Sequence, residues 1–202
     1  RKEKEKVNKK LEELSEKLTA YRKKTALLLE KNIIKELKDL NMKNINFKVN
    51  IKHKENFSSE GRDDIEFLIS TNIGSNLNSL QKVVSGGEAS RIMLAFKKIM
   101  TDVDSIPTII FDEIDTGISG KVSQMAGLKM KYISKNHQVI CITHSPQVAS
   151  FAKNHFLIEK KIKENNTFST IKKLNNNERI SEIARLLSGL NITEKSINNA
   201  KE

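Results

Sequence analysis

The chain has 202 residues, of which 37% are hydrophobic and 30% are charged, and its formal net charge is +11. This length and apolar content allow one core plus an appendage, and no apolar run approaches the roughly 20 residues that a membrane helix needs. No signal peptide is readable either, so we expect a cytoplasmic protein without a membrane partner.

Residues 1–40 are predicted to form one long helix. Its apolar residues recur at alternating spacings of four and three, a heptad stripe that calls for a partner helix, because one helix cannot bury its own seam. An amphipathic helix lying on the domain is the alternative. The pattern begins without a capping residue, so we expect the chain to start inside a coiled-coil arm. The stripe consists of Val7, Leu11, Leu14, Leu18, Tyr21, Thr25 and Leu28.

Residues 41–202 are predicted to form an α/β domain. Alternating apolar residues indicate strands over 45–51 and 65–71, and the polar segment 52–64 between them is expected to be a loop. The other predicted strands are 108–111, 138–143, 156–160 and 168–174, the last two forming a hairpin. The predicted helices are 88–101, 121–134, 146–152, 178–187 and a ragged end at 193–202. Ser145 is the predicted cap of the helix that Pro146 begins, and Gly189 is the predicted stop after 178–187.

Two apolar strands of this domain are followed by polar residues. Asp112 and Glu113 come directly after 108–111, and His144 follows 138–143. Parallel strands present such residues at their carboxyl edge, where open α/β sheets bind ligands. Consecutive acids there can hold Mg²⁺ and polarise an attacking water in nucleotide hydrolysis. A carboxylate pair at a solvated turn is the alternative interpretation.

The segment Ser85-Gly86-Gly87-Glu88 precedes the first helix of this domain. The glycines let a backbone approach closely, Ser85 can cap the helix, and free N–H groups at a helix start favour an anion. An ordinary glycine turn and N-cap would have the same sequence.

These motifs together resemble the ABC ATPases. Ser85 to Glu88 is similar to their signature, Thr108 to Asp115 to the Walker B strand, and His144 to the switch histidine. Within that superfamily the resemblance is to the RecN family of bacterial SMC-like DNA-repair proteins, over about two thirds of the chain. It rests on the strings Phe111 to Gly120, Thr143 to Ala149 and Ile183 to Gly189.

The resemblance implies an ABC-ATPase-like C-terminal lobe, with a parallel sheet flanked by helices, over 41–202, and the returning helix of a coiled-coil arm over 1–40. ATP and Mg²⁺ are the implied cofactors. Asp112 would hold the metal, Glu113 would act as the base, and His144 would sense the γ-phosphate. The implied nucleotide contacts, made across a dimer seam, are Ser85, Gly86, Gly87, Glu88 and Asp115.

No Gly-x-x-x-x-Gly-Lys-Ser/Thr occurs in the chain, so the phosphate loop is expected on an N-terminal lobe. The implied partners are that lobe, a second protomer across ATP, and double-stranded DNA ends at the nucleoid, with repair and recombination as the function. The chain alone is expected to be an inactive ATPase. The alternatives are another SMC-like or ABC ATPase, and a non-hydrolytic dimerisation module. The basic charge fits a DNA partner, although the excess of Lys and Asn indicates a compositional bias.

Overall fold

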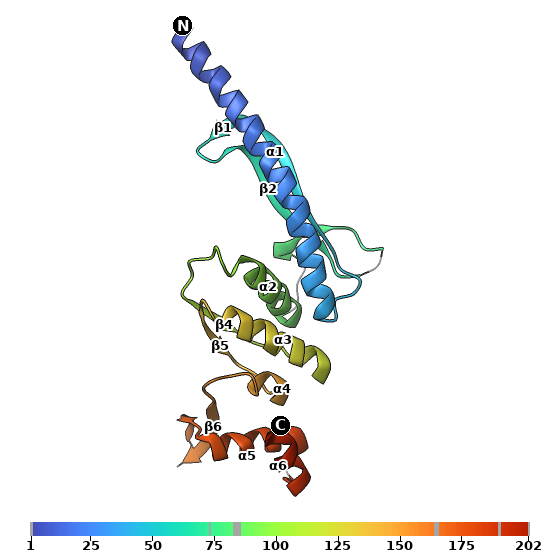
Figure 1. Cartoon of the computed structure of the whole chain (residues 1–202), viewed down its shortest axis with the longest axis vertical. Helices are drawn as coiled ribbons and strands as arrows, with labels where there is room; N and C mark the ends of the chain where they lie inside the picture. The colour runs from blue at the N-terminus through green and yellow to red at the C-terminus, as the bar shows by residue number, and fades with distance from the viewer. Residues whose placement is uncertain (1, 73, 83–85, 164–165, 190, 202) are drawn as a thin grey trace. The chain divides into compact units, whose positions relative to one another are not determined.

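A computed structural model describes residues 2–72, 74–82, 86–163, 166–189 and 191–201 (Figure 1). Ser85 lies outside these residues, as do residues 164 and 165 of the connection between the predicted hairpin strands 156–160 and 168–174. The chain divides into two compact units, Arg1–Ile99 and Met100–Glu202. The proposed boundary between arm and lobe at residue 40 stays a prediction. None of the described helices is both long and apolar enough to cross a membrane.

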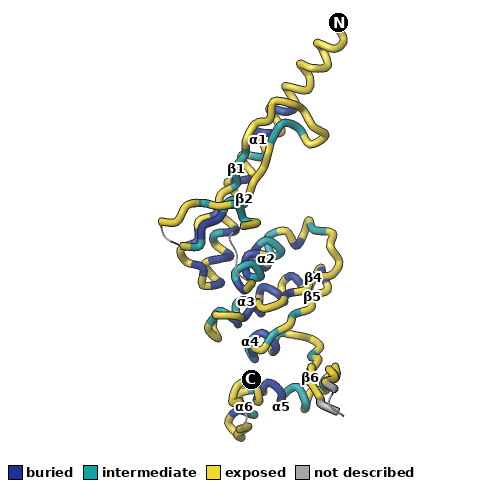
Figure 2. Tube along the Cα trace, turned by 180° about the vertical axis from the view of Figure 1, so that it is seen from behind, coloured by how far each residue is buried: buried dark blue, intermediate teal, exposed yellow. Residues whose placement is uncertain are grey.

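The predicted N-terminal helix is present as α1 (Lys2–Asp39). It ends in a tight turn: the N–H of Met42 donates to the carbonyl of Leu37 at 3.0 Å, and Asn41 has a φ of 63°. A left-handed residue two positions after the last helical one closes many helices, and Asn tolerates that conformation. Residues 2–14 of α1 are exposed throughout (Figure 2).

The predicted loop over 52–64 is wrong, because these residues extend two antiparallel strands. These strands, β1 (Asn46–Ser58) and β2 (Gly61–Ser70), pair from Asn46 opposite Ser70 to His53 opposite Asp63, and close at Ser58 and Gly61. The outer half of the hairpin lacks an apolar face, so hydrophobic alternation could not reveal it. Gly61 suits the turn, because its φ is +93°.

The core of the first unit lies where α1, the hairpin and α2 (Gly86–Met100) meet. The short strand β3 (Asn78–Ser79) pairs with β2, and a 3₁₀ turn (Leu80–Lys82) follows. Phe47, Phe67 and Phe96 form a cluster with ring centroids 5.5–5.7 Å apart. The buried residues around it are Ile33, Leu37, Met42, Ile45, Ile69, Ile92 and Ala95.

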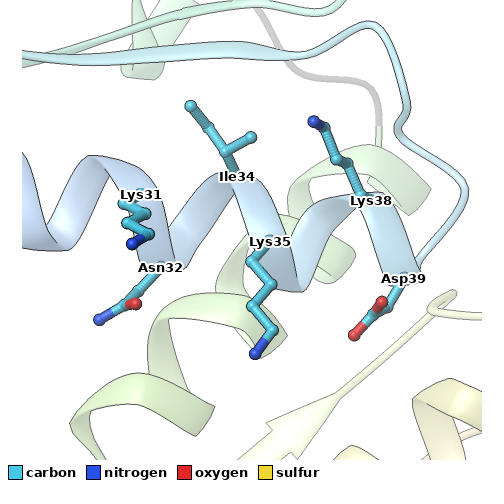
Figure 3. A pocket seen from close by; sticks show the side chains of 6 residues that line it. All are labelled: Lys31, Asn32, Ile34, Lys35, Lys38 and Asp39. Atoms are coloured by element: carbon cyan, nitrogen blue, oxygen red, sulfur yellow. The ribbon is translucent and has the colours of Figure 1, made fainter.

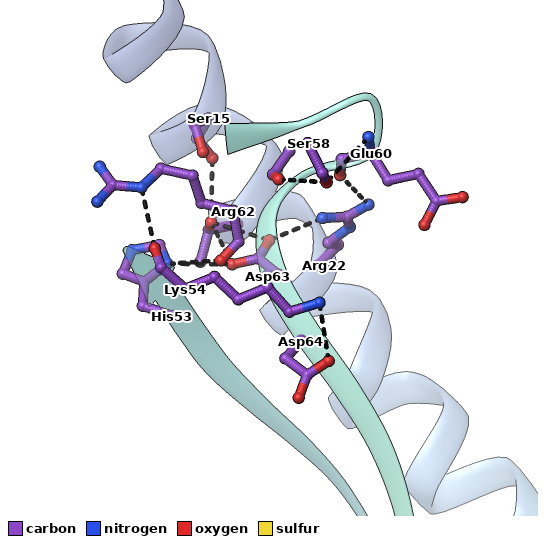
Figure 4. Close-up of polar contacts among 11 residues, drawn as sticks. Ser15, Arg22, His53, Lys54, Ser58, Glu60, Arg62, Asp63 and Asp64 are labelled. Atoms are coloured by element: carbon purple, nitrogen blue, oxygen red, sulfur yellow. Dashed lines mark hydrogen bonds and ion pairs between the residues drawn. The ribbon is translucent and has the colours of Figure 1, made fainter. Parts of the chain in front are cut away.

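Beyond this core, polar contacts hold the hairpin against α1 (Figure 4). The carboxylate of Asp63, which has no exposed surface, accepts hydrogen bonds from the Thr19 hydroxyl at 2.8 Å and the Arg22 guanidinium at 2.9 Å. Arg22 also donates to the Glu60 carbonyl at 2.8 Å. Burial acts to raise the pKa of Asp63, but hydrogen bonds from Arg22 and Thr19 outweigh it, and the pKa is lowered. His53 lies 3.4 Å from the same carboxylate.

The second unit contains the predicted parallel pair, β4 (Thr108–Phe111) and β5 (Gln138–Cys141), joined by α3 (Gly120–Ile133). After α4 (Pro146–Ala149) come the antiparallel strands β6 (Phe156–Lys163) and β7 (Asn166–Lys173). Two helices end the chain, α5 (Asn176–Ser188) and α6 (Glu194–Lys201). Helix α3 packs on α4, α4 on α5 and α5 on α6. The predicted cap Ser145 accepts a hydrogen bond from the N–H of Val148, and Gly189 ends α5 as predicted.

We predict that Asp63→Asn lowers the unfolding free energy at pH 7 by about 1–2 kcal/mol, because it weakens charged hydrogen bonds in a buried site. Asp64→Asn is the matched control: its exposed carboxylate makes one surface ion pair, with Lys54 at 3.1 Å, and should matter little. The lowered pKa of Asp63 means that its contribution is complete above its unfolded pKa, about 4, and is lost as the pH falls through the folded value. Thermal melts at pH 7 and pH 3 should therefore show the difference between Asp63→Asn and wild type shrinking in acid. A constant difference would contradict this account.

Gly127 of α3 provides a second stability prediction. A Cβ at this position would lie 2.3 Å from Cδ2 of Phe151, so the helix can pack there only without a side chain. Gly127→Ala should cost about 1–3 kcal/mol through overpacking and lower the melting temperature by several degrees. Gly120→Ala should be nearly neutral, because its Cβ would meet the flexible end of Gln147 at 3.3 Å. Equal melting temperatures for the two variants would rule out this packing constraint.

Candidate functional site

The two parallel strands end side by side, as predicted. Phe111 pairs with Cys141, and the N–H of Ile142 donates to the Phe111 carbonyl at 2.9 Å. The chain segment carrying Asp112 and Glu113 therefore leaves the sheet next to the segment that leads to His144. The sheet edge predicted from two apolar runs is present within the second unit.

Asp115 joins these two segments. One of its oxygens, Oδ2, accepts hydrogen bonds from the Thr143 hydroxyl, from the N–H of His144 at 3.1 Å and from the N–H of Ser145 at 2.9 Å. Only 2% of the Asp115 side chain is exposed. The loop after β5 is therefore held by a carboxylate that follows β4, across 28 to 30 residues of sequence.

The other oxygen of Asp115, Oδ1, is buried and has no hydrogen-bond partner among the described residues. A buried carboxylate oxygen in that state is costly, so the bonds to the other oxygen must offset it. The prediction that Asp115 contacts a nucleotide remains untested, and the contacts that the structure describes are those that position the His144 loop.

The imidazole of His144 is 79% exposed, and its Nδ1 lies 3.5 Å from Oδ2 of Asp115. That distance is an ion pair only when the ring is protonated. The backbone of His144 is fixed by Asp115 while the ring remains open to solvent, an arrangement that suits a side chain meant to contact a ligand.

Glu113 has a strained backbone. Its φ is +55°, in the left-handed region that non-glycine residues seldom adopt, and its N-terminal neighbour Asp112 is also exposed. The N–H of Thr116 donates to the Glu113 carbonyl at 3.2 Å, which closes the turn after the strand. Strain of this kind costs on the order of 1–2 kcal/mol and is concentrated at functional sites. The left-handed backbone at Glu113 takes the Asp112–Glu113 segment out of regular strand geometry.

Cys141 contributes no reactive thiol to this edge. Burial, with the negative charges of Asp115 and Asp112 nearby, raises its pKa to about 12. The thiol is therefore protonated at neutral pH, and a protonated thiol is a poor nucleophile.

Asp112 fits a nucleotide-bound Mg²⁺. Such a metal is usually held by one or two carboxylates, waters and phosphate oxygens rather than by a cage of protein ligands. An exposed carboxylate at the carboxyl end of a parallel strand satisfies that requirement. No group of three or more His, Cys, Asp or Glu residues in the described part of the chain could hold a metal by itself.

The predicted signature residues Gly86, Gly87 and Glu88 begin α2 in the first unit. Gly87 is buried and Gly86 is exposed at the helix start, whereas Ser85 lies outside the described residues. Their role in binding a nucleotide stays a prediction. Sequence reasoning missed the hydrogen bonds of Thr143 and Ser145 to Asp115. The available signal was the position of these two residues on either side of His144.

Solved structures define the class of fold. An Smc head domain with coiled coil and joint from Pyrococcus yayanosii matches 99% of this chain and 34% of its own, at 19% identity and a TM-score of 0.58. An Smc head from Pyrococcus furiosus, bound to the C-terminal domain of ScpA, covers 83% of this chain and 39% of its own, with 19% identity and a TM-score of 0.52. The chain therefore has the fold found in Smc head domains.

Sequence comparison narrows the class. Proteins named "DNA repair protein RecN" are 46% identical over 196 residues in Rickettsia conorii, 41% over 196 in Halalkalibacterium halodurans and 39% over 200 in Bacillus subtilis. These matches include 92–97% of this chain but 35–36% of the relatives, so the chain spans about a third of their length. No family model matches it. The chain belongs to the RecN family and corresponds to its C-terminal region.

We predict that Asp115→Ala loosens the loop after β5, because the buried N–H of Ser145, the partly buried N–H of His144 and the Thr143 hydroxyl each lose an acceptor, at about 1–3 kcal/mol for a buried group left unpaired. The Ser145 N–H keeps a second acceptor, the Thr143 hydroxyl at 3.0 Å, so the His144 amide should respond more strongly. Hydrogen exchange followed by NMR should show the amides of His144 and Ser145 exchanging faster. Asp104→Ala, which removes a half-buried loop carboxylate that accepts a hydrogen bond from the Ile106 N–H, should leave both amides unchanged. Unaltered exchange in Asp115→Ala would contradict the assigned role.

Proposed function

We propose that this chain is the C-terminal part of an SMC-like protein that binds and hydrolyses ATP in DNA double-strand-break repair and recombination. The proposal rests mainly on the joined ends of β4 and β5, where Asp115 links the Asp112–Glu113 segment to the His144 loop. Membership in the RecN family and the SMC-head fold support the same function.

Each residue at this edge would have its own task. Asp112 would hold the magnesium ion that the nucleotide brings, and this ion would neutralise phosphate charge. Glu113, placed by its left-handed backbone, would orient and deprotonate the attacking water. The exposed ring of His144 would contact the γ-phosphate, and Asp115 would keep that ring in place through the loop backbone.

The exposed apolar face of the β4–β5 pair supports the proposal that a second lobe completes the site. The exposed fractions of Ile110, Ile140 and Ile142 are 64%, 43% and 50%. Parallel sheets are normally covered on both faces, so an apolar surface at this position requires a cover. We propose that the N-terminal lobe of the full-length protein, which would bring the phosphate loop, supplies it.

The signature segment would act in a second protomer. Gly86 and Gly87 give a backbone that a phosphate can approach, at the start of a helix that favours anions. Two heads would then enclose ATP between them, and hydrolysis would release them. Coupling of this cycle to the binding of DNA ends at the nucleoid belongs to the same proposal.

We expect Glu113→Gln in the full-length protein to lower ATP turnover at least about a hundredfold, the scale of lost general-base catalysis, while ATP binding is kept. The same variant should accumulate an ATP-bound dimer, measured by light scattering with and without ATP. Glu194→Gln, in α6, is the control and should keep wild-type turnover. Normal turnover in Glu113→Gln would show that Glu113 is not the base.

The isolated 202-residue chain offers a second test of the divided site. We expect no steady ATP turnover from it, because the phosphate loop is expected on another lobe. Steady turnover that Glu113→Gln abolishes would show that the chain contains a complete site, and the two-lobe proposal would then be wrong.

A further inference from the structure

Helix α1 carries an unbroken row of lysines beside its heptad stripe. The row consists of Lys10, Lys17, Lys24, Lys31 and Lys38, one in every heptad. A spacing of seven residues repeats about every 10.5 Å along a helix, at almost the same angle around it. Lys10, Lys17 and Lys24 each directly precede a stripe residue, and Lys31 and Lys38 precede the positions where the same spacing continues beyond Leu28. The row therefore borders one side of the stripe.

The stripe itself is uncovered in this structure. Exposed fractions along it include 53% for Val7, 52% for Leu14, 72% for Tyr21 and 57% for Leu28. On its other side lie Ser15 and Arg22, and Arg22 is engaged by Asp63 and the Glu60 carbonyl of the hairpin. The open apolar surface is therefore bounded by the hairpin on one side and by cations on the other.

The usual explanation for helix lysines, pairing with acids one turn away, fails for the last three members of the row. Positions three and four residues from Lys24, Lys31 and Lys38 hold no Asp or Glu. No ion pair involves any of the five among the described residues. At the end of the row, Lys31, Lys35 and Lys38 follow one another at spacings of four and three residues, where like charges repel, so a conformation that brings acids to them would be favoured.

The row continues past the apolar stripe into a hollow on α1 (Figure 3). The side chains that line it include Lys31, Lys35 and Lys38, together with Asn32, Ile34 and Asp39. A helix that runs antiparallel to α1 would bring its N-terminal turn here. Acidic residues stabilise the N-terminal turn of a helix, so the three lysines would face side chains of opposite charge there.

We propose that α1 pairs with an antiparallel helix of the full-length protein whose flank facing the lysine row is acidic. This inference rests on the proposed SMC-like function together with the coiled-coil arm expected from the heptad stripe, and it adds the charge that the partner helix must carry. Charged residues beside an apolar seam set partner choice and orientation. A second copy of α1 is excluded as an antiparallel partner, because lysine rows would face each other.

The test measures binding of the 202-residue chain to three synthetic helical peptides of about four heptads each. All three have the same leucine seam, and they differ only in the residue at the two positions that flank the seam, which is Glu, Gln or Lys. Fluorescence anisotropy at low salt should show the Glu peptide binding about tenfold more tightly than the Gln peptide. This is the difference in affinity expected from three exposed ion pairs of ordinary strength. Lys24→Glu/Lys31→Glu/Lys38→Glu should reverse the order and favour the Lys peptide. The difference should shrink at high salt.

The matched control is Lys2→Glu/Lys9→Glu/Lys23→Glu, which makes the same charge change on the same helix but away from the row, and should keep the wild-type preference. Lys24→Gln/Lys31→Gln/Lys38→Gln should lose the preference without reversing it, and circular dichroism would verify that the helix is intact.

Equal affinity of the wild-type chain for all three peptides overturns the proposal. So does binding of a short DNA duplex that the row variant alone abolishes, since the row would then serve DNA. Neither result depends on ATP turnover, so failure here is distinguishable from failure of the proposed ATPase.

Discussion

The candidate site depends on one buried carboxylate. Without Asp115, β4 and β5 would still pair, but the loop that carries His144 would lose three hydrogen bonds to the segment that carries Asp112 and Glu113. Because one oxygen accepts all three hydrogen bonds, a small shift of Asp115 would move the whole loop. The same constraint explains how a largely exposed histidine can have a defined position, because its backbone is fixed while its ring stays open to solvent.

A comparable division between fixed and open surfaces exists in α1. The hairpin covers one side of the helix through Asp63 and, nearer the base, through apolar residues that include Ile33 and Leu37. The contact requires small or polar side chains on the helix, and Thr19 and Ala26 meet that need, since both are buried there. The heptad stripe lies on a different side, so bracing the base of the helix does not compete with pairing along its length.

The sequence was sufficient where the signal is local. Apolar runs located β4 and β5, the Ser145-Pro146 pair located the start of α4, and Gly189 located the end of α5. Polar contacts between distant segments could not be read in this way. The sequence predicts a loop for the outer half of the β1–β2 hairpin, because the contact that stabilises this half joins Asp63 to Arg22 of α1, 41 residues earlier in the chain. Asp115 was assigned a nucleotide contact by resemblance, since nothing in its spacing indicates that it bonds to Thr143.

The N-terminal part of α1 brings these points together. Residues 2–14 contact no other element through a buried side chain, and a helix of that length is marginally stable alone in water. The hairpin stabilises the helix as far as Ser15, where burial begins. Order beyond that residue must come from something that covers the stripe from Val7 onward. The hairpin therefore sets the minimum length of ordered α1, and any partner helix determines how much further the order extends. A partner whose charges complement the lysine row would lengthen the ordered helix and fix the register between the two helices. A partner that covered only the apolar stripe would leave that register free to slip by a heptad.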